Sequence, residues 1–226
     1  HWEEISYYQD LSEDFIREFK DKVDWAWIHF RNKQSKEFYN EFKDEINKAS
    51  SIGTLTHNYI ERYINDTTLD ITKEYIEQEL SPSVINGVQS FILWYTDVCK
   101  NNTVEILGME QKLSCPWYGG TYDLLIKISR KIYLVDFKTS NHVSYKYFLQ
   151  LAAYRYILET YHNIKLDGCL ILQVDKKYPS YEEYVLCFDN PYHIKFIEQC
   201  TETFFSLVYA YHNRYKTEAM YKNIFK

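Results

Sequence analysis

From about residue 104, the chain changes from a helical pattern to short apolar runs that are typical of β-strands. Three such runs follow one another up to residue 139, and the last two are separated only by a polar turn around Ser129 and Arg130. A turn this short joins neighbouring antiparallel strands. We therefore expect an antiparallel meander, which limits the fold to one that contains a sheet.

A helical pattern at residues 145–161 follows these runs, and two further strand-like runs lie at 168–175 and 182–188. After Pro191, apolar residues recur at helical spacing along a long amphipathic segment. This order of elements predicts a fold of the α/β or α+β class. We expect one mixed sheet of about five strands, with a helix that crosses it and flanking helices.

The first part of the chain, residues 1–100, is expected to be mainly helical. Apolar side chains recur there at steps of three and four, which is the period of an α-helix. One helix is expected to begin near Thr54 or Thr56. One or two more are expected within residues 71–99, with Pro82 in a first helical turn.

The chain shows no linker, repeat or low-complexity tract. We expect a single domain over 1–226, with its sheet-containing core at 104–226, because this length suits one domain. The net charge of −6 argues against a general nucleic-acid coat protein, which should be basic. It does not exclude an enzyme that contacts nucleic acid at one site, because binding there depends on the charge of that site and not on the net charge of the chain.

The five cysteines are scattered and form no C-x-x-C pair, so the sequence signals neither a zinc ribbon nor an iron–sulfur cluster. Their odd number suggests reduced thiols. No run approaches the ~18 apolar residues that a membrane span needs, and there is no signal peptide. We expect a protein of the cytoplasm, or of a nucleic-acid-containing compartment of the host, that is not secreted and has no membrane partner.

A carboxylate, Asp136, ends the third run at a point where the strand should still be apolar. If the turn is centred between Ser129 and Arg130, Asp123 and Asp136 lie six positions from it on either side and therefore face each other on neighbouring strands. Two carboxylates in that arrangement repel, and a cation between them would reverse the sign. Oxygen ligands of this kind suit Mg²⁺ or Mn²⁺.

Asp136 and Lys138 are two positions apart on a strand, so their side chains share a face, whereas Phe137 points into the core. Lys138 could then hold or polarise a water molecule beside the cation, and the Phe137 carbonyl could face the site. The alternative is an ordinary salt bridge at a strand end. The opposed Asp123, with a glycine pair before it that lets a substrate come close, weakens this alternative.

The helix at 145–161 adds Gln150 and Tyr154, which lie on one helix face at spacing i, i+4. Their alternative role is packing on the sheet. The interval 137–158 contains no acidic residue, yet its cations and nearby histidine could contact phosphates. These residues are Lys138, His142, Lys146 and Arg155. The alternative is that acidic residues are missing from this interval by chance.

Two upstream residues could join the site. His57 lies near the expected helix start, and a single histidine is otherwise a structural residue. Glu110 lies on the strand before the one that contains Asp123. The alternative to a role in the site is an ordinary side chain that faces the solvent. Imidazole and carboxylate are both ligands of divalent metals.

The segments "GTLTHNYIE", "GMEQKL", "GGTYDLLI", "YLVDFKT" and "QLAAYRY", in this order, resemble the RecB-like branch of the PD-(D/E)XK nuclease superfamily. The resemblance spans about residues 53–156, and the later elements fit the fold without further signature residues. It implies a core like that of restriction endonucleases. Tyr122 stands where the superfamily's name has proline, as is usual in this branch.

The resemblance implies a phosphodiesterase that uses one or two Mg²⁺ or Mn²⁺ ions. It assigns Lys138 to orienting or activating the attacking water, and Gln150 and Tyr154 to positioning the substrate strand or supporting the site. The metal ligands it implies are His57, Asp123, Asp136, the carbonyl of Phe137 and, less directly, Glu110. The cysteines lack the four-Cys pattern of some relatives, so we expect no iron–sulfur cluster.

We therefore expect a stand-alone, metal-dependent deoxyribonuclease, and exonuclease action on DNA ends rather than internal cleavage. The compact chain is like those of viruses or mobile elements, which suggests DNA processing, recombination or repair, with DNA and a recombination or replication protein as partners. One rival is an endonuclease on RNA or DNA, because cap-snatching viral endonucleases use a similar set of His, acids and Lys. The other rival is an inactive nuclease fold that binds nucleic acid or protein.

Overall fold

The computed structural model describes residues 36–225, apart from the side chains of 36–46 and 49. The chain divides into two compact units, His1–Thr54 and Leu55–Lys226, and the site considered below lies within the second. The helices expected before residue 36 lie outside the described residues, and the single domain over 1–226 stays a prediction.

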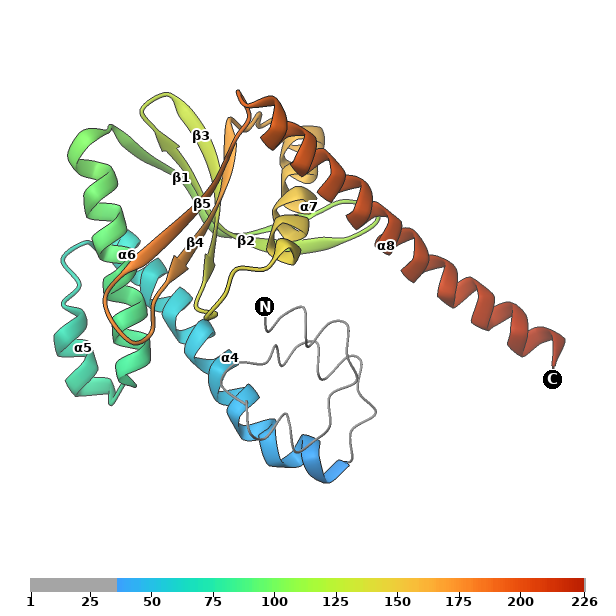
Figure 1. Cartoon of the computed structure of the whole chain (residues 1–226), viewed down its shortest axis with the longest axis horizontal. Helices are drawn as coiled ribbons and strands as arrows, with labels where there is room; N and C mark the ends of the chain where they lie inside the picture. Colours follow the sequence, from blue (N-terminus) through green and yellow to red (C-terminus); the bar gives the residue numbers. More distant parts are fainter. Residues whose placement is uncertain (1–35, 226) are drawn as a thin grey trace. The chain divides into compact units, whose positions relative to one another are not determined.

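A five-stranded sheet forms the centre of the second unit (Figure 1). Its strands lie in chain order, and every neighbouring pair is antiparallel except β3 and β4, which are parallel. The strands are β1 (Val104–Ser114), β2 (Gly119–Ile128), β3 (Lys131–Lys138), β4 (Gly168–Val174) and β5 (Tyr181–Cys187). Helix α7 (Tyr145–Tyr161) makes the connection between the two parallel strands. The expected mixed sheet with a crossing helix is confirmed, and the fold belongs to the α+β class.

The expected register of β2 and β3 is also confirmed. Their pairing runs from Ile128 opposite Lys131 to Leu124 opposite Val135, with Ser129 and Arg130 as the turn. Ser129 has a φ of 59°, the left-handed conformation that tight hairpin turns require.

The remaining helices are α4 (Lys36–Asn65), α5 (Ile71–Gln78), α6 (Pro82–Asn101) and α8 (Pro191–Ile224). The expected helix start at Thr54 or Thr56 is wrong, because α4 continues through both. Thr56 is fully buried, and Gly87 of α6 leaves room for it: a Cβ there would lie 2.9 Å from Thr56 Cγ2. This packing outweighs the preference of threonine for helix starts. None of the described helices is long and apolar enough to cross a membrane.

Helices cover both faces of the sheet at β3 (Figure 1). On one face, Phe137 packs against Phe91 of α6, with 5.3 Å between ring centroids. On the other face, Leu134 packs in a buried cluster with Leu151 and Ile157 of α7. Burial from both sides holds the carboxyl end of β3, where the candidate site lies, in a fixed place.

Candidate functional site

Three side chains from separate elements converge near the carboxyl end of β3. His57 of α4, Glu110 of β1 and Asp123 of β2 place one potential ligand atom each within 4.8 Å of one another. The His57 Nδ1 atom lies 3.5 Å from Asp123 Oδ1 and 3.6 Å from Glu110 Oε1. The side chains of His57 and Glu110 are 24% and 26% exposed, so the cluster is accessible to small ions and water.

The His57 ring is oriented by the backbone of β3. Its Nε2 lies 3.1 Å from the carbonyl oxygen of Phe137. A carbonyl can only accept, so Nε2 carries the proton and donates it, and Nδ1 is turned toward the two carboxylates. Histidines that bind metals typically donate their other ring N–H to a carbonyl or carboxylate in this way. Both the helical position of His57 and its ring orientation therefore suit a ligand.

Asp123 takes its position from the end of the β2–β3 ladder. Its Oδ2 accepts a 2.6 Å hydrogen bond from the backbone N–H of Phe137, while Oδ1 faces His57. The residue is 8% exposed. Asp123 directly precedes Leu124, which pairs with Val135 at the end of the ladder. Continuing this register places Asp136 opposite Asp123, as predicted.

Glu110 has a strained backbone. The pairs of Met109 with Leu124 and Gln111 with Tyr122 leave it opposite Asp123, and its φ is 46°, which is rare for a residue with a side chain. Its Oε1 is buried and accepts no hydrogen bond from any described residue. A buried carboxylate oxygen in that state is costly, and a cation would satisfy it. Two carboxylates and an imidazole thus fit a divalent metal ion.

Asp136 and Lys138 form a buried ion pair at the end of β3. Asp136 is 2% exposed, and its Oδ2 lies 2.6 Å from Lys138 Nζ, without the alignment of a hydrogen bond. Lys138 also donates to Gln150 Oε1 at 3.2 Å, and Gln150 Nε2 lies 3.3 Å from the Tyr154 hydroxyl. The pair is not the exposed salt bridge that was the alternative. Four predicted site residues are therefore joined in one chain of contacts.

The electrostatics of the cluster are set by burial and by opposite charges. Burial raises the pKa of Asp136, although the Lys138 ammonium opposes this. Burial lowers the pKa of Lys138, but Asp136 outweighs it and the net pKa is raised, so Lys138 stays charged. Burial likewise lowers the pKa of His57, yet Asp123 and then Glu110 raise it to about 10. At neutral pH, an imidazolium therefore balances the two carboxylates where a metal ion would.

We expect a divalent ion to displace about one proton from His57 when it binds near neutral pH. The reason is that Nδ1 must be deprotonated to act as a ligand, whereas its pKa of about 10 keeps it protonated in the metal-free protein. Affinity for Mn²⁺ should therefore increase as the pH rises from 6 to 9. Calorimetric titration in two buffers with different ionisation enthalpies measures the released protons. Release of no proton would contradict displacement of a proton from His57 by the metal.

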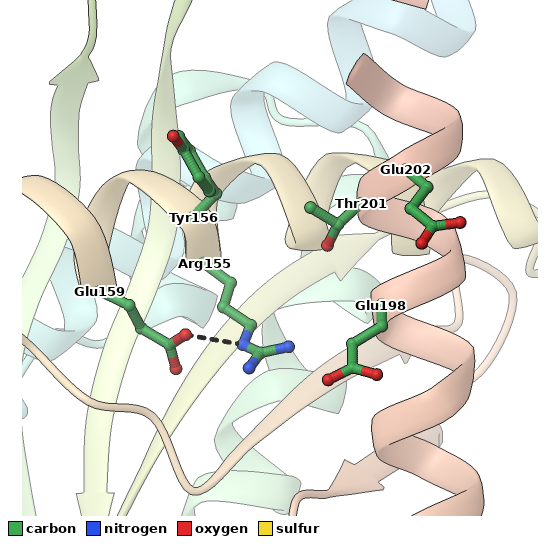
Figure 2. A pocket seen from close by; sticks show the side chains of 6 residues that line it. All are labelled: Arg155, Tyr156, Glu159, Glu198, Thr201 and Glu202. Carbon is green, nitrogen blue, oxygen red and sulfur yellow. Dashed lines mark hydrogen bonds and ion pairs between the residues drawn. The ribbon is translucent and has the colours of Figure 1, made fainter. Parts of the chain in front are cut away.

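The other residues that were predicted to contact phosphates lie in three different surroundings. His142 is exposed in the loop before α7, and Lys146 is partly buried on the first turn of that helix. Arg155 points away from the cluster, into a cavity of about 330 Å³ between α7 and α8 (Figure 2). There its Nε donates to Glu159 Oε2 at 3.0 Å, and its guanidinium lies 4.5 Å from the Phe188 ring centroid. The substrate roles of these residues stay predictions.

Two contributions to the site were not predicted. The Tyr147 ring lies beneath Lys138, with Nζ 4.8 Å from its centroid, and helps to hold the ammonium. Its place three residues before Gln150 on the same helix could have indicated this. Gly120, predicted only as a point of close approach, leaves space for Tyr154: a Cβ there would lie 2.5 Å from the Tyr154 hydroxyl.

Comparisons with known proteins do not assign a family. No family model and no curated protein matches the chain. Among solved structures, it is similar to the crystal structure of SSO0001, with 15% sequence identity and a TM-score of 0.32 over 69% of this chain and 74% of that chain. A similarity of this size carries no argument about function. The candidate metal centre therefore rests on its own geometry.

Proposed function

We propose that this protein is a metal-dependent nuclease that hydrolyses DNA phosphodiester bonds with Mg²⁺ or Mn²⁺, acting on DNA ends. The observation that carries the proposal is the convergence of His57, Glu110 and Asp123 within 4.8 Å. A lysine that is ion-paired to the neighbouring Asp136 accompanies them. Carboxylates that can hold a divalent ion, beside a fixed ammonium, suit hydrolysis of a phosphodiester by a metal-bound water.

A bound divalent ion would supply a Lewis acid for the phosphoryl oxygen and a reactive water. Asp123, Glu110 and His57 would hold it, and Asp136, next to Asp123 in the register, is proposed as a further ligand. The Phe137 carbonyl accepts from His57 and has a second lone pair for the same role. Lys138, fixed by Asp136 and Gln150, would orient the attacking water and balance charge on the phosphate.

We further infer that the chain is a stand-alone member of the RecB-like branch of the PD-(D/E)XK superfamily. The support is the cluster of His57, Glu110 and Asp123, with the Asp136–Lys138 pair next to Asp123 in the register of an α+β sheet. Gln150 and Tyr154 follow the lysine at hydrogen-bonding distances, which favours this branch over the cap-snatching endonucleases. DNA with a free end and a recombination or replication protein are the proposed partners.

The experiment is an incubation of purified protein with Mn²⁺ and linear single-stranded DNA, linear duplex DNA, closed circular DNA and RNA. Asp136→Asn is tested beside the wild type, and Asp189→Asn is the control, since Asp189 lies in an exposed ion pair with Lys131. Loss of linear DNA only, with an inactive Asp136→Asn, supports the proposal. Cut circles indicate an endonuclease, and faster loss of RNA indicates the RNA-cleaving rival. If nothing is cut, the protein is a binding module.

Alanine at Gly120 is expected to lower kcat about tenfold by moving Tyr154. The added Cβ would lie 2.5 Å from the Tyr154 hydroxyl and 2.6 Å from its Cε1, so the ring must shift and its contact with Gln150 is lost. Tyr154→Phe should show a similar loss because it removes the same hydroxyl. Steady-state cleavage by the two single variants and the double variant tests this. Losses that multiply in the double variant would show that Gly120 acts independently of Tyr154.

A further inference from the structure

The loop between β4 and β5, residues 175–180, lies at the same end of the sheet as the candidate site. Strands β3 and β4 are parallel and pair Lys138 with Gln173. Their carboxyl ends therefore lie side by side, and the loop continues from the end of β4. In sheets with parallel strands, ligands bind outside the carboxyl ends of the strands. Neither Lys176, Lys177 nor Tyr178 of this loop was predicted to take part in function.

Two side chains of α6 hold the backbone of this loop. Asn86 of α6 donates to the carbonyls of Lys176 and Lys177 at 3.0 and 2.9 Å. Ser90, which is fully buried, accepts from the Ser180 N–H at 3.0 Å, while its own hydroxyl donates to the Asn86 carbonyl at 2.7 Å. The loop is thus ordered before any ligand arrives, which lowers the entropy cost of binding.

The same turn of α6 also contacts the elements of the site. Gly87 packs on Thr56, the residue before His57, and Phe91 packs on Phe137. Asn86 and Ser90 face the loop from the same turn. Helix α6 therefore contacts both the loop and residues that adjoin the metal cluster. A nucleic-acid strand bound at the cluster can run past the loop because both lie beyond the carboxyl ends of β3 and β4.

The side chains of this loop offer positive charge and an aromatic ring to the solvent. Tyr178 is 73% exposed and Lys177 is exposed, and neither side chain contacts a described residue through an ion pair, hydrogen bond or ring. Lys176 is partly buried, and burial lowers its pKa. An anion beside it would offset that cost.

The described acidic residues around the loop form no ion pair with these lysines, although the charge of Asp175 raises the pKa of Lys176 against the effect of burial. The carboxylate of Asp175 accepts the backbone N–H groups of Lys177 and Tyr178. Glu182 accepts from the Tyr184 hydroxyl, and Glu183 accepts from Trp94 Nε1 at 2.6 Å. The loop therefore presents two lysines without ion pairs to any residue that the structure describes and an exposed tyrosine, next to carboxylates that are held by hydrogen bonds.

We propose that the 176–178 loop is a docking element for the nucleic-acid strand that enters the site, with Lys177 on a phosphate and Tyr178 stacked on a base. This inference rests on the proposed nuclease function and names its substrate class. A ring can stack on a base only where that base is not covered by its neighbours, so the element fits a single-stranded segment or a frayed end. Ammonium groups beside it bind the phosphates without sequence preference.

The test compares steady-state cleavage of a single-stranded DNA with Mn²⁺ by the full chain and by single variants. Tyr178→Ala should raise KM about tenfold with kcat unchanged, because stacking contributes to binding and not to chemistry. Lys177→Ala should raise KM and reduce the slope of log affinity against log salt by about 0.7. Lys165→Ala is the matched control, since this exposed lysine precedes β4 at the other end of the strand. Tyr178→Phe keeps the ring and should behave as wild type.

The outcomes separate this inference from the proposed function. If Tyr178→Ala and Lys177→Ala keep the KM of Lys165→Ala while wild type cleaves DNA, the docking element is wrong and the nuclease stands. If Tyr178→Phe is impaired as much as Tyr178→Ala, stacking is overturned. If wild type neither binds nor cleaves nucleic acid, both the function and the docking element fall.

Discussion

Asparagine in place of Asp123 is expected to abolish divalent-metal binding and to lower DNA cleavage by about a thousandfold or more. The carboxylate contributes one oxygen to the cluster and faces His57 Nδ1 at 3.5 Å. Asparagine has nearly the same shape, and its carbonyl oxygen can still accept from the Phe137 N–H, as Asp123 Oδ2 does at 2.6 Å. The fold should therefore persist while the charge is lost. Calorimetric titration with Mn²⁺ and cleavage of linear DNA measure the two effects.

The matched control for this substitution is Asp189→Asn, in which an exposed carboxylate loses the same charge. Asp189 pairs with Lys131 at the surface, so metal binding and cleavage should not change. An Asp123→Asn protein that binds Mn²⁺ as tightly as the control would show that the metal lies elsewhere.

Methionine in place of Lys138 is expected to lower the free energy of unfolding by about 3 kcal/mol in metal-free buffer. Asp136 is 2% exposed, and Lys138 Nζ at 2.6 Å is its counter-ion. Without it, a buried carboxylate is left unpaired. The pKa of Asp136 is already raised by burial, so the cost should shrink as the pH falls and the carboxyl takes up a proton. Urea unfolding at several pH values, with EDTA present, measures this dependence.

The double variant Asp136→Asn/Lys138→Met separates stability from chemistry. It removes both charges, so most of the lost stability should return, whereas cleavage should stay absent because Lys138 is still missing. A Lys138→Met protein that unfolds like the wild type at pH 8 would indicate that Asp136 is neutral in the folded state. A Lys138→Met protein that cleaves DNA normally would remove this lysine from the proposed chemistry.

The sheet and half of the site could be predicted because they depend on local rules. A two-residue turn at Ser129 and Arg130 determines which residues of β2 and β3 pair, and this placed Asp123 beside Asp136 before any coordinates. The i, i+4 spacing of Gln150 and Tyr154 likewise predicted their contact. These relations hold within a hairpin or one helix and need no knowledge of tertiary packing.

Other features depend on contacts between distant segments. The left-handed backbone of Glu110 has no sequence signal, and the continuation of α4 through Thr56 depends on its packing against Gly87. The cations of the acid-free interval 137–158 are predicted to contact phosphates, but Arg155 lies five residues after Gln150, about 140° around the helix. It points into a different cavity (Figure 2). A segment without acidic residues therefore does not need to carry all of its cations on the same face.

The position of Mn²⁺ in crystals of the protein tests the central claim most directly. We predict an anomalous-scattering peak about 2.2 Å from His57 Nδ1 and from carboxylate oxygens of Glu110 and Asp123. The cavity between α7 and α8 also carries acids, Glu159, Glu198 and Glu202, and offers a rival position (Figure 2). A peak at that cavity, or no peak at the cluster at Mn²⁺ concentrations that support DNA cleavage, would contradict the account.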